Sequence, residues 1–335
     1  MMLAIKQYHT QLHTRLQQIS WHNLPGRSLQ LLKGMLVPAI AMLIFLLLWA
    51  STARNIETSL GELPGPVQVW EQAGNLLGEH QAERQREAAF IARQVERNAQ
   101  RLAEDPNAEV RIRPYAGTPT FIDQIITSLL TVATGFVIAT VIAIPIGILC
   151  GMSATLYSAL NPLIQIFKPV SPLAWLPLVT MVVSALYISD DPMFSRSFLN
   201  SAITVTLCCL WPTIINTTVG VTSVSKDLIN VSRVLRLNWF TKTMKIVLPS
   251  AMPMMFTGMR LSLGIGWMVL IAAEMLAQNP GLGKFVWDEF QNGSSQSLAR
   301  IMVAVFAIGL VGFALDRGML LLQRYVSWDK SAVLR

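Results

Sequence analysis

The residue types that perform chemistry are sparse in this sequence, and their arrangement excludes most enzymatic reactions. No Gly-x-x-x-x-Gly-Lys-Ser/Thr loop is present, so the chain lacks the phosphate loop that holds ATP in many ATPases. No Cys-x-x-Cys pair occurs, and Cys150, Cys208 and Cys209 stand in apolar runs, where cysteine behaves as a small apolar residue. All four histidines lie outside those runs. We therefore expect no catalytic residue, no metal site and no cofactor bound by this chain.

One acidic residue, Glu274, interrupts a long apolar run. An ionisable residue in such a run is a functional candidate by default, because it is costly to place in lipid. The carboxylate could face a polar path between helices. It could instead pair with a neighbouring donor near the end of its helix, and we favour this second interpretation.

Threonines and prolines give several apolar runs a polar or irregular side. Pro169, Pro172 and Pro177 lie within nine residues, and each removes a backbone donor and bends or breaks a helix. Gly147 and Gly151 form a small-xxx-small pair that allows close approach of another helix. Helix packing alone would also explain each of these features. The candidate residues for a path between helices are Thr131, Thr134, Pro172, Trp175, Thr206, Thr213 and Glu274.

The runs that hold these residues are long enough to cross a membrane. The chain is 53% hydrophobic and only 13% charged, whereas a soluble domain typically has about 25% charged residues. A spanning helix needs roughly 20 apolar residues. We expect an all-α membrane protein with six transmembrane helices. The supporting runs are 35–52, 124–167, 169–189, 197–225, 255–277 and a last run that begins at 301.

Lysine and arginine placement predicts the orientation. With both termini inside, the short inside segments hold most of the basic residues that neighbour the spans, as the positive-inside rule requires. The net charge of +7 then follows from membrane topology, and we expect no nucleic-acid partner. Residues 1–34 form a basic inside tail, which either lies on membrane lipids or only anchors the topology. Residues 35–52 are the first span, and residues 326–335 form an inside tail.

Residues 53–121 are expected outside the membrane, between the first span and the rest of the chain. Ala88, Ile91, Val95, Ala99 and Leu102 recur at helical spacing in a highly charged stretch. This pattern predicts a charged amphipathic helix that lies on the membrane domain. Its outer face could be solvated or could contact an external partner.

Residues 223–256, called the basic segment below, separate two spans of the core domain at 122–325. A helix can begin at Ser225, with Asp227 in its first turn. A second short helix should run from 240 to 247 and stop at Leu248-Pro249. The apolar face around Val234, Leu235 and Leu237 could enter a groove on a partner, or the segment could lie on lipid headgroups.

The basic segment resembles the cytoplasmic "EAA" loop of bacterial ABC-importer permeases. The pattern of that loop is Glu-Ala-Ala, three residues, Gly, nine residues and Ile-x-Leu-Pro. Here Asn230-Val231-Ser232 takes the place of Glu-Ala-Ala, and Arg236 takes the place of Gly. Ile246, Leu248 and Pro249 match at the right spacing.

The flanking residues narrow the resemblance. "KPVSPLAWLPL", "FTGMRLSLGIGWMVLIAAEMLA" and "GLGKFVWDEF" are similar to permeases of the nitrate, sulfonate, taurine and bicarbonate importers, over about residues 120–325. The first and last regions look most like nitrate permeases. The charged insert at 71–113 departs from the shorter members.

The resemblance implies a type I, MetI-like permease in the bacterial inner membrane, through which a small oxyanion passes. ATP and Mg would act in separate cytoplasmic ATPase subunits, an external binding protein would deliver the anion, and a second permease copy would complete the path. The loop would dock into the ATPase through Asn230, Ser232, Arg233, Val234, Leu235, Arg236, Leu237, Trp239, Ile246, Leu248 and Pro249. The likeness to nitrate permeases implies nitrate as the substrate, and sulfonate, taurine or bicarbonate is the alternative. The alternative class is a secondary transporter or channel, which predicts internal repeats and embedded coupling charges.

Overall fold

The computed structural model describes residues 26–53, 55–58, 61–105, 110–188, 193–294 and 296–326. Much of the tail expected at 1–34, and nearly all of the tail expected at 326–335, lies outside these residues. The chain divides into two compact units, Met1–Val67 and Gln68–Arg335.

The first unit contains one long apolar helix. Helix α2 (Gly26–Ala53) is followed by two antiparallel two-residue strands, β1 (Glu57–Thr58) and β2 (Gly61–Glu62). The part from Leu36 to Ala53 is long and apolar enough to cross a membrane. Its large apolar side chains are mostly exposed, as expected for a helix that lipid or another helix must cover.

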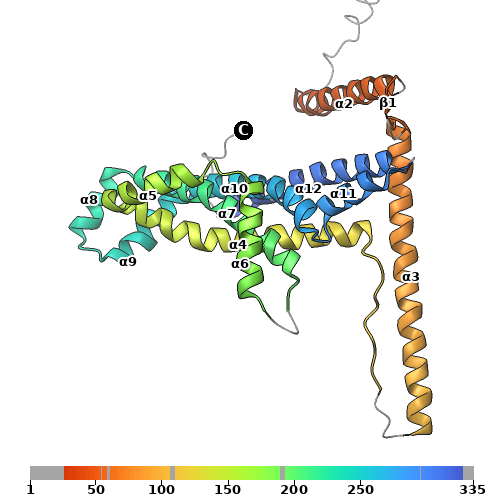
Figure 1. The fold of residues 1–335 in the computed structure, drawn as a ribbon. Helices are drawn as coiled ribbons and strands as arrows, with labels where there is room; N and C mark the ends of the chain where they lie inside the picture. Colours follow the sequence, from red (N-terminus) through yellow and green to blue (C-terminus); the bar gives the residue numbers. More distant parts are fainter. Residues whose placement is uncertain are drawn as a thin grey trace, which may run out of the picture. The chain divides into compact units, whose positions relative to one another are not determined.

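The second unit is a helical bundle with a long helix across one of its ends. In this unit, four helical stretches of the described chain are long and apolar enough to cross a membrane. The third stretch, Trp239–Ala277, begins before its main helix. The main helices of the four are α4 (Phe121–Met152), α7 (Arg196–Thr222), α10 (Leu248–Ala277) and α12 (Ser297–Val326). Figure 1 shows α7 and α10 beside α4, with α3 (Pro66–Glu104) running crosswise at the right. With α2, the described chain has five candidate spans.

A bent helix pair stands where the proline-rich run predicted a broken span. Helices α5 (Ala154–Phe167) and α6 (Pro172–Leu186) meet at an angle of 101°. Ser171 caps α6, and Pro172 occupies its first turn, where a missing backbone N–H costs no helical hydrogen bond. The predicted break is therefore confirmed. Counting the pair as one span gives six.

Close packing of α7 against α4 and α10 forms the centre of the bundle. A Cβ atom on Gly147 would lie 2.6 Å from Thr217 Cβ, and one on Gly151 would lie 2.5 Å from Val221 Cβ. Across the same interface Thr218 Oγ1 donates a hydrogen bond to the Gly147 carbonyl oxygen (3.2 Å). The small-xxx-small prediction is thus confirmed, with α7 as the neighbouring helix.

Replacing Gly147 by valine should destabilise the bundle, because the branched side chain must displace α7. Overpacking of this kind costs about 1–3 kcal/mol. We expect a lower melting temperature of the purified protein in detergent. Gly309→Val is the control, since a Cβ there meets nothing within 4 Å. Equal melting temperatures of the two variants would contradict this packing.

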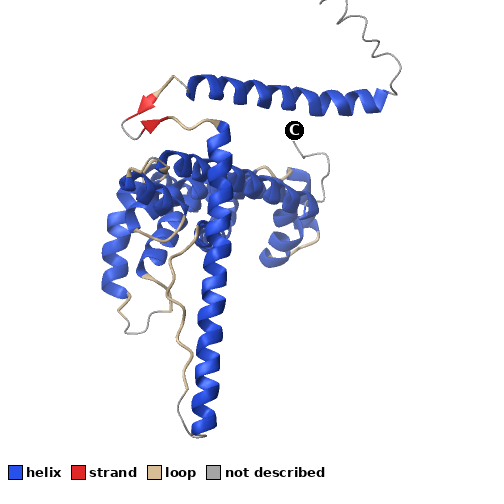
Figure 2. Cartoon of the chain, turned by 90° about the vertical axis from the view of Figure 1, so that its right-hand side faces the viewer, coloured by secondary structure: helices blue, strands red, loops and turns tan. Residues whose placement is uncertain are grey.

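Helix α3 is anchored to the bundle through its middle. Arg84 pairs with Asp123 at the start of α4 (3.0 Å), and Arg300 of α12 binds Glu79 (2.7 Å) and, on α11 (Leu282–Asn292), Glu289 (2.6 Å). Beyond these contacts α3 continues next to residues 110–120, called the return segment, as Figure 2 shows. The predicted charged helix therefore exists, but its expected apolar stripe is exposed; the buried residues are Val69, Leu76, Glu83 and Gln94.

Candidate functional site

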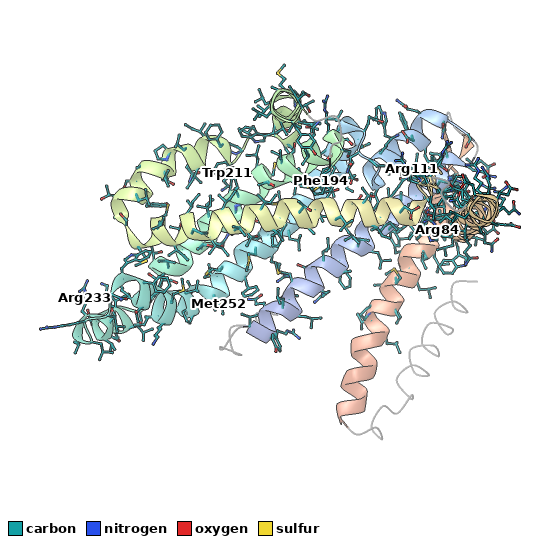
Figure 3. The ribbon with its side chains drawn as sticks, turned by 90° about the horizontal axis from the view of Figure 1, so that it is seen from below. Arg84, Arg111, Phe194, Trp211, Arg233 and Met252 are labelled. Atoms are coloured by element: carbon teal, nitrogen blue, oxygen red, sulfur yellow. The ribbon has the colours of Figure 1, made fainter. Side chains whose placement is uncertain are left out.

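The basic segment lies at the opposite end of the bundle from α3. In Figure 3, Arg233 marks one end of the second unit, and Arg84 and Arg111 mark the other. Helix α8 (Lys226–Val234) begins as predicted: Ser225 Oγ accepts a hydrogen bond from the Leu228 N–H (3.4 Å), and Asp227 lies in the first turn. A carboxylate there interacts favourably with the helix dipole.

Helix α8 ends in a tight turn centred on Arg236. The Leu237 N–H donates to the Ser232 carbonyl, and the Arg236 N–H donates to the Arg233 carbonyl, both at 3.0 Å. These two bonds define a Schellman cap, whose left-handed position usually holds glycine. Arg236 occupies that position with φ 48°. This geometry gives a physical reason for the glycine of the "EAA" pattern and shows that arginine adopts the same conformation here.

Arg236→Gly should leave the turn intact and stabilise it, because a left-handed non-glycine residue costs roughly 1–2 kcal/mol. Arg236→Val should destabilise the same turn, since a branched Cβ tolerates positive φ poorly. The measurement is co-purification of the ATPase with each variant. We expect retention for glycine and a marked loss for valine. Equal loss in both variants would show that the charge of Arg236, and not its backbone conformation, matters, because both substitutions remove that charge.

The helix expected to stop at Leu248-Pro249 does not stop there. Asn238 caps α9 (Trp239–Lys242), a π-helical turn η2 (Thr243–Val247) follows, and α10 starts directly at Leu248. Pro249 lies in the first turn of α10, where the missing N–H is tolerated. The termination prediction was therefore wrong, and the basic segment is joined to the span by continuous helix.

An apolar face is exposed along α8 and α9. Val234 and Leu235 are 82% and 63% exposed, and Val231, Trp239 and Phe240 are exposed as well. Large apolar side chains clustered in this way mark interaction surfaces. Of the other residues assigned to the loop, Asn230, Arg233, Arg236 and Pro249 are exposed, Leu237, Ile246 and Leu248 are half-buried, and Ser232 is buried.

Glu274 is fully buried in a polar cluster at the other end of α10. Ser128 Oγ of α4 lies 2.8 Å from both carboxylate oxygens, and the Gly283 N–H donates to Oε2 (3.0 Å). Ser128 Oγ also accepts a hydrogen bond from the Leu282 N–H (2.9 Å). Glu274 thus pairs with neighbouring donors and fixes the start of α11 against α4.

The threonines proposed for a path are mostly used in packing between helices. Thr206 Oγ1 donates to the Gly135 carbonyl (3.1 Å), and Thr213 shares a hydrogen bond with Ser262 (2.7 Å). Thr131 accepts from the Asn279 amide (3.3 Å), and all three side chains are buried. Thr134 is half-buried and donates to the carbonyl of its own helix at Leu130.

Pro172 and Trp175 lie at the bend between α5 and α6. The Trp175 ring is 5.7 Å from that of Phe167, which stacks on Trp211 at 6.1 Å. The indole nitrogens of both tryptophans are buried and have no hydrogen-bond partner in the described part of the chain.

Sequence reasoning missed an ion pair between α10 and α12. Arg260 Nε and Nη2 donate to the two carboxylate oxygens of Asp316 at 2.6 and 3.1 Å, and each side chain is 39% exposed. The pair borders a groove of about 480 Å³ that Thr257, Leu261 and Met268 also line. No local spacing rule could have found this pair, because Arg260 and Asp316 are 56 positions apart.

Within the described residues, no group of three or more potential metal ligands is present. His9 and His13, four positions apart, lie outside the described residues.

The sequence and the fold of this chain were both compared with known proteins, and both comparisons found related transport proteins. Residues 143–328 match the family "Binding-protein-dependent transport system inner membrane component". The fold resembles a chain of the inward-facing MetNI methionine ABC transporter, with a TM-score of 0.53 and 14% identity, over 62% of this chain and 96% of that one.

Three relatives extend the match. Nitrate import permease protein NrtB of Synechocystis is 32% identical over 86% of this chain and 88% of its own. The NrtB of Synechococcus elongatus is 37% identical over 61% and 69%. Bicarbonate transport system permease protein CmpB of Synechococcus elongatus is 32% identical over 89% and 91%. The chain belongs to the binding-protein-dependent transport system inner membrane components and is a multi-pass permease of the ABC-importer type.

Proposed function

We propose that this chain forms the transmembrane path of an ATP-driven importer for a small oxyanion, most of all nitrate. The names of the relatives carry this proposal, since nitrate permeases match the chain at 37% and 32% identity. Bicarbonate is the second candidate, because CmpB matches over a larger share of the chain. Both anions are small, planar and singly charged, so one site could be tuned to either.

The proposal includes six spans with both termini inside. The basic segment would then lie in the cytoplasm and residues 53–121 outside. ATP and Mg would act in separate ATPase subunits, and a second permease copy with surrounding lipid would complete the path. The exposed apolar face of α8 and α9 supports the cytoplasmic assignment, since a clustered apolar surface of this kind is typical of a docking site for a soluble subunit.

Pro172 and Trp175, at the bend of α5 and α6, remain our candidates for the path, and we add Trp211 of α7 to them. Trp175 and Trp211 have indole N–H groups without an acceptor among the described residues, and an indole N–H can donate only. An oxyanion is an acceptor. We assign the buried threonines and Glu274 to helix packing, because their polar atoms are already bonded.

Uptake of labelled nitrate and of labelled bicarbonate, measured in cells with and without the gene, tests the substrate. We expect nitrate uptake to fall to background on deletion and to return with the gene. Loss of bicarbonate uptake alone would replace nitrate by bicarbonate. The purified chain without ATPase subunits should hydrolyse no ATP, and uptake that persists without those subunits would favour the secondary-transporter class.

A further inference from the structure

The far part of α3 and the return segment enclose a strongly basic cleft. Arg97 and Arg101 project from α3, and Arg111 and Arg113 project from the return segment, into a cavity of about 650 Å³. Phe90, Gln94, Asn98 and Pro114 form the remaining wall. Figure 3 shows Arg111 next to α3, which is seen there end on. We call this cavity the basic cleft.

Specific contacts hold the two walls together. The Gln94 side chain donates to the Arg113 carbonyl (3.0 Å) and accepts from the Arg113 N–H (2.8 Å). The Phe90 and Tyr115 rings lie 5.4 Å apart, and Tyr115 Oη donates to Glu83 (2.8 Å). That hydrogen bond raises the pKa of the Tyr115 hydroxyl. Backbone and side-chain hydrogen bonds therefore fix the shape of the cleft.

The charges of the cleft are not neutralised within the described chain. Arg84, Arg86 and Arg300, which lie outside the cleft, all form ion pairs. Among the described residues, none of the four arginines of the cleft forms an ion pair, and none of the residues that line the cleft is acidic. Four guanidinium groups around one cavity repel one another, and an anion that enters relieves this repulsion.

The size and position of the cleft favour a protein as the source of that anion. One nitrate or bicarbonate ion could bind only some of the four guanidinium groups. Several carboxylates on one protein surface could instead each bind one arginine through two parallel hydrogen bonds. The exposed apolar side chains Ile91, Val95 and Leu102 lie roughly 120° around α3 from Arg97 and Arg101. A bilayer that covers this apolar edge leaves the cleft facing the aqueous phase.

We propose that the basic cleft docks an acidic, carboxylate-rich element of the substrate-binding protein that this family requires. The inference rests on the proposed function, since it places α3 outside the cell membrane. A partner docked there would be linked mechanically to the bundle. Arg84 joins α3 to α4, Glu79 joins α3 to Arg300 of α12, and Arg300 also binds α11.

The test is direct binding of the purified binding protein to the full transporter in nanodiscs. Arg97→Glu with Arg111→Glu reverses one charge on each wall. We expect the dissociation constant to rise at least about tenfold at low salt, and the salt dependence of binding to flatten. Arg93→Glu is the matched control, since Arg93 lies one turn away on α3 outside the cleft, and it should change affinity less than about twofold.

Several results would overturn the proposal. One is unchanged affinity of the double variant in an intact complex. Another is equal loss in the double variant and in Arg93→Glu, which would indicate only a general charge effect. A third is a change restricted to binding of phosphatidylglycerol vesicles by the transporter, which would make the cleft a lipid site. Uptake of labelled nitrate by the wild type is measured separately. A wrong substrate assignment therefore does not affect the interpretation of the binding measurement.

Discussion

Leu235→Glu should separate this chain from its ATPase and stop uptake. Leu235 ends α8, is 63% exposed, and lies next to Val234 in the apolar face of the basic segment. Burying an unpaired carboxylate in an interface costs about 3–5 kcal/mol, which weakens binding by roughly two to three orders of magnitude or more. Because Leu235 is mostly exposed and lies outside the spans, insertion and folding should survive. The measurement is co-purification of the ATPase from detergent at normal levels of the permease.

The control is Asn230→Glu on the same helix. It adds the same charge, and glutamate is the residue at this place in the "EAA" pattern. We expect the ATPase to be retained and uptake to persist. If the Leu235→Glu protein still brings down the ATPase, then the exposed face of α8 is not the contact, and a lipid-facing role for the basic segment becomes the better explanation.

Glu274→Leu should strongly destabilise the bundle. The leucine would leave the Ser128 hydroxyl and the Gly283 N–H without their acceptor inside a fully buried cluster. Each orphaned donor costs about 1–3 kcal/mol. A Cβ on Gly281 would overlap the carboxylate, so the site is also too tight for rearrangement. We expect the melting temperature in detergent to fall by about 5–10 °C.

Two further variants make this result specific. Glu274→Gln keeps one acceptor oxygen and should fall between the wild type and Glu274→Leu. Glu96→Leu removes an exposed acid of α3 and should leave the melting temperature unchanged. A Glu274→Leu protein that melts like the wild type but transports nothing would place the carboxylate in the path, against the packing role assigned here.

The sequence by itself determined the features that depend on neighbouring residues. Apolar runs of sufficient length specified the spanning helices, because unpaired backbone groups are intolerable in lipid. Ser225 and Asp227 specified the start of α8, and the prolines around Pro172 specified the bend of 101°. Ile246, Leu248 and Pro249, together with the flanking motifs, indicated the family, which the match over residues 143–328 confirms. All of these signals act over a few residues along the chain.

Only the tertiary structure decided which polar groups meet. Glu274 and Ser128 are 146 positions apart, and Arg260 and Asp316 are 56 apart. Local periodicity cannot record such pairs, since it shows which face of a helix is polar but not which helix lies opposite. Which side of α3 the chain itself covers was decided in the same way: the return segment covers Gln94 and Glu83, and the apolar stripe is left exposed on the described chain. Burial is decided by the available partner surface, and that surface exists only once the chain has folded.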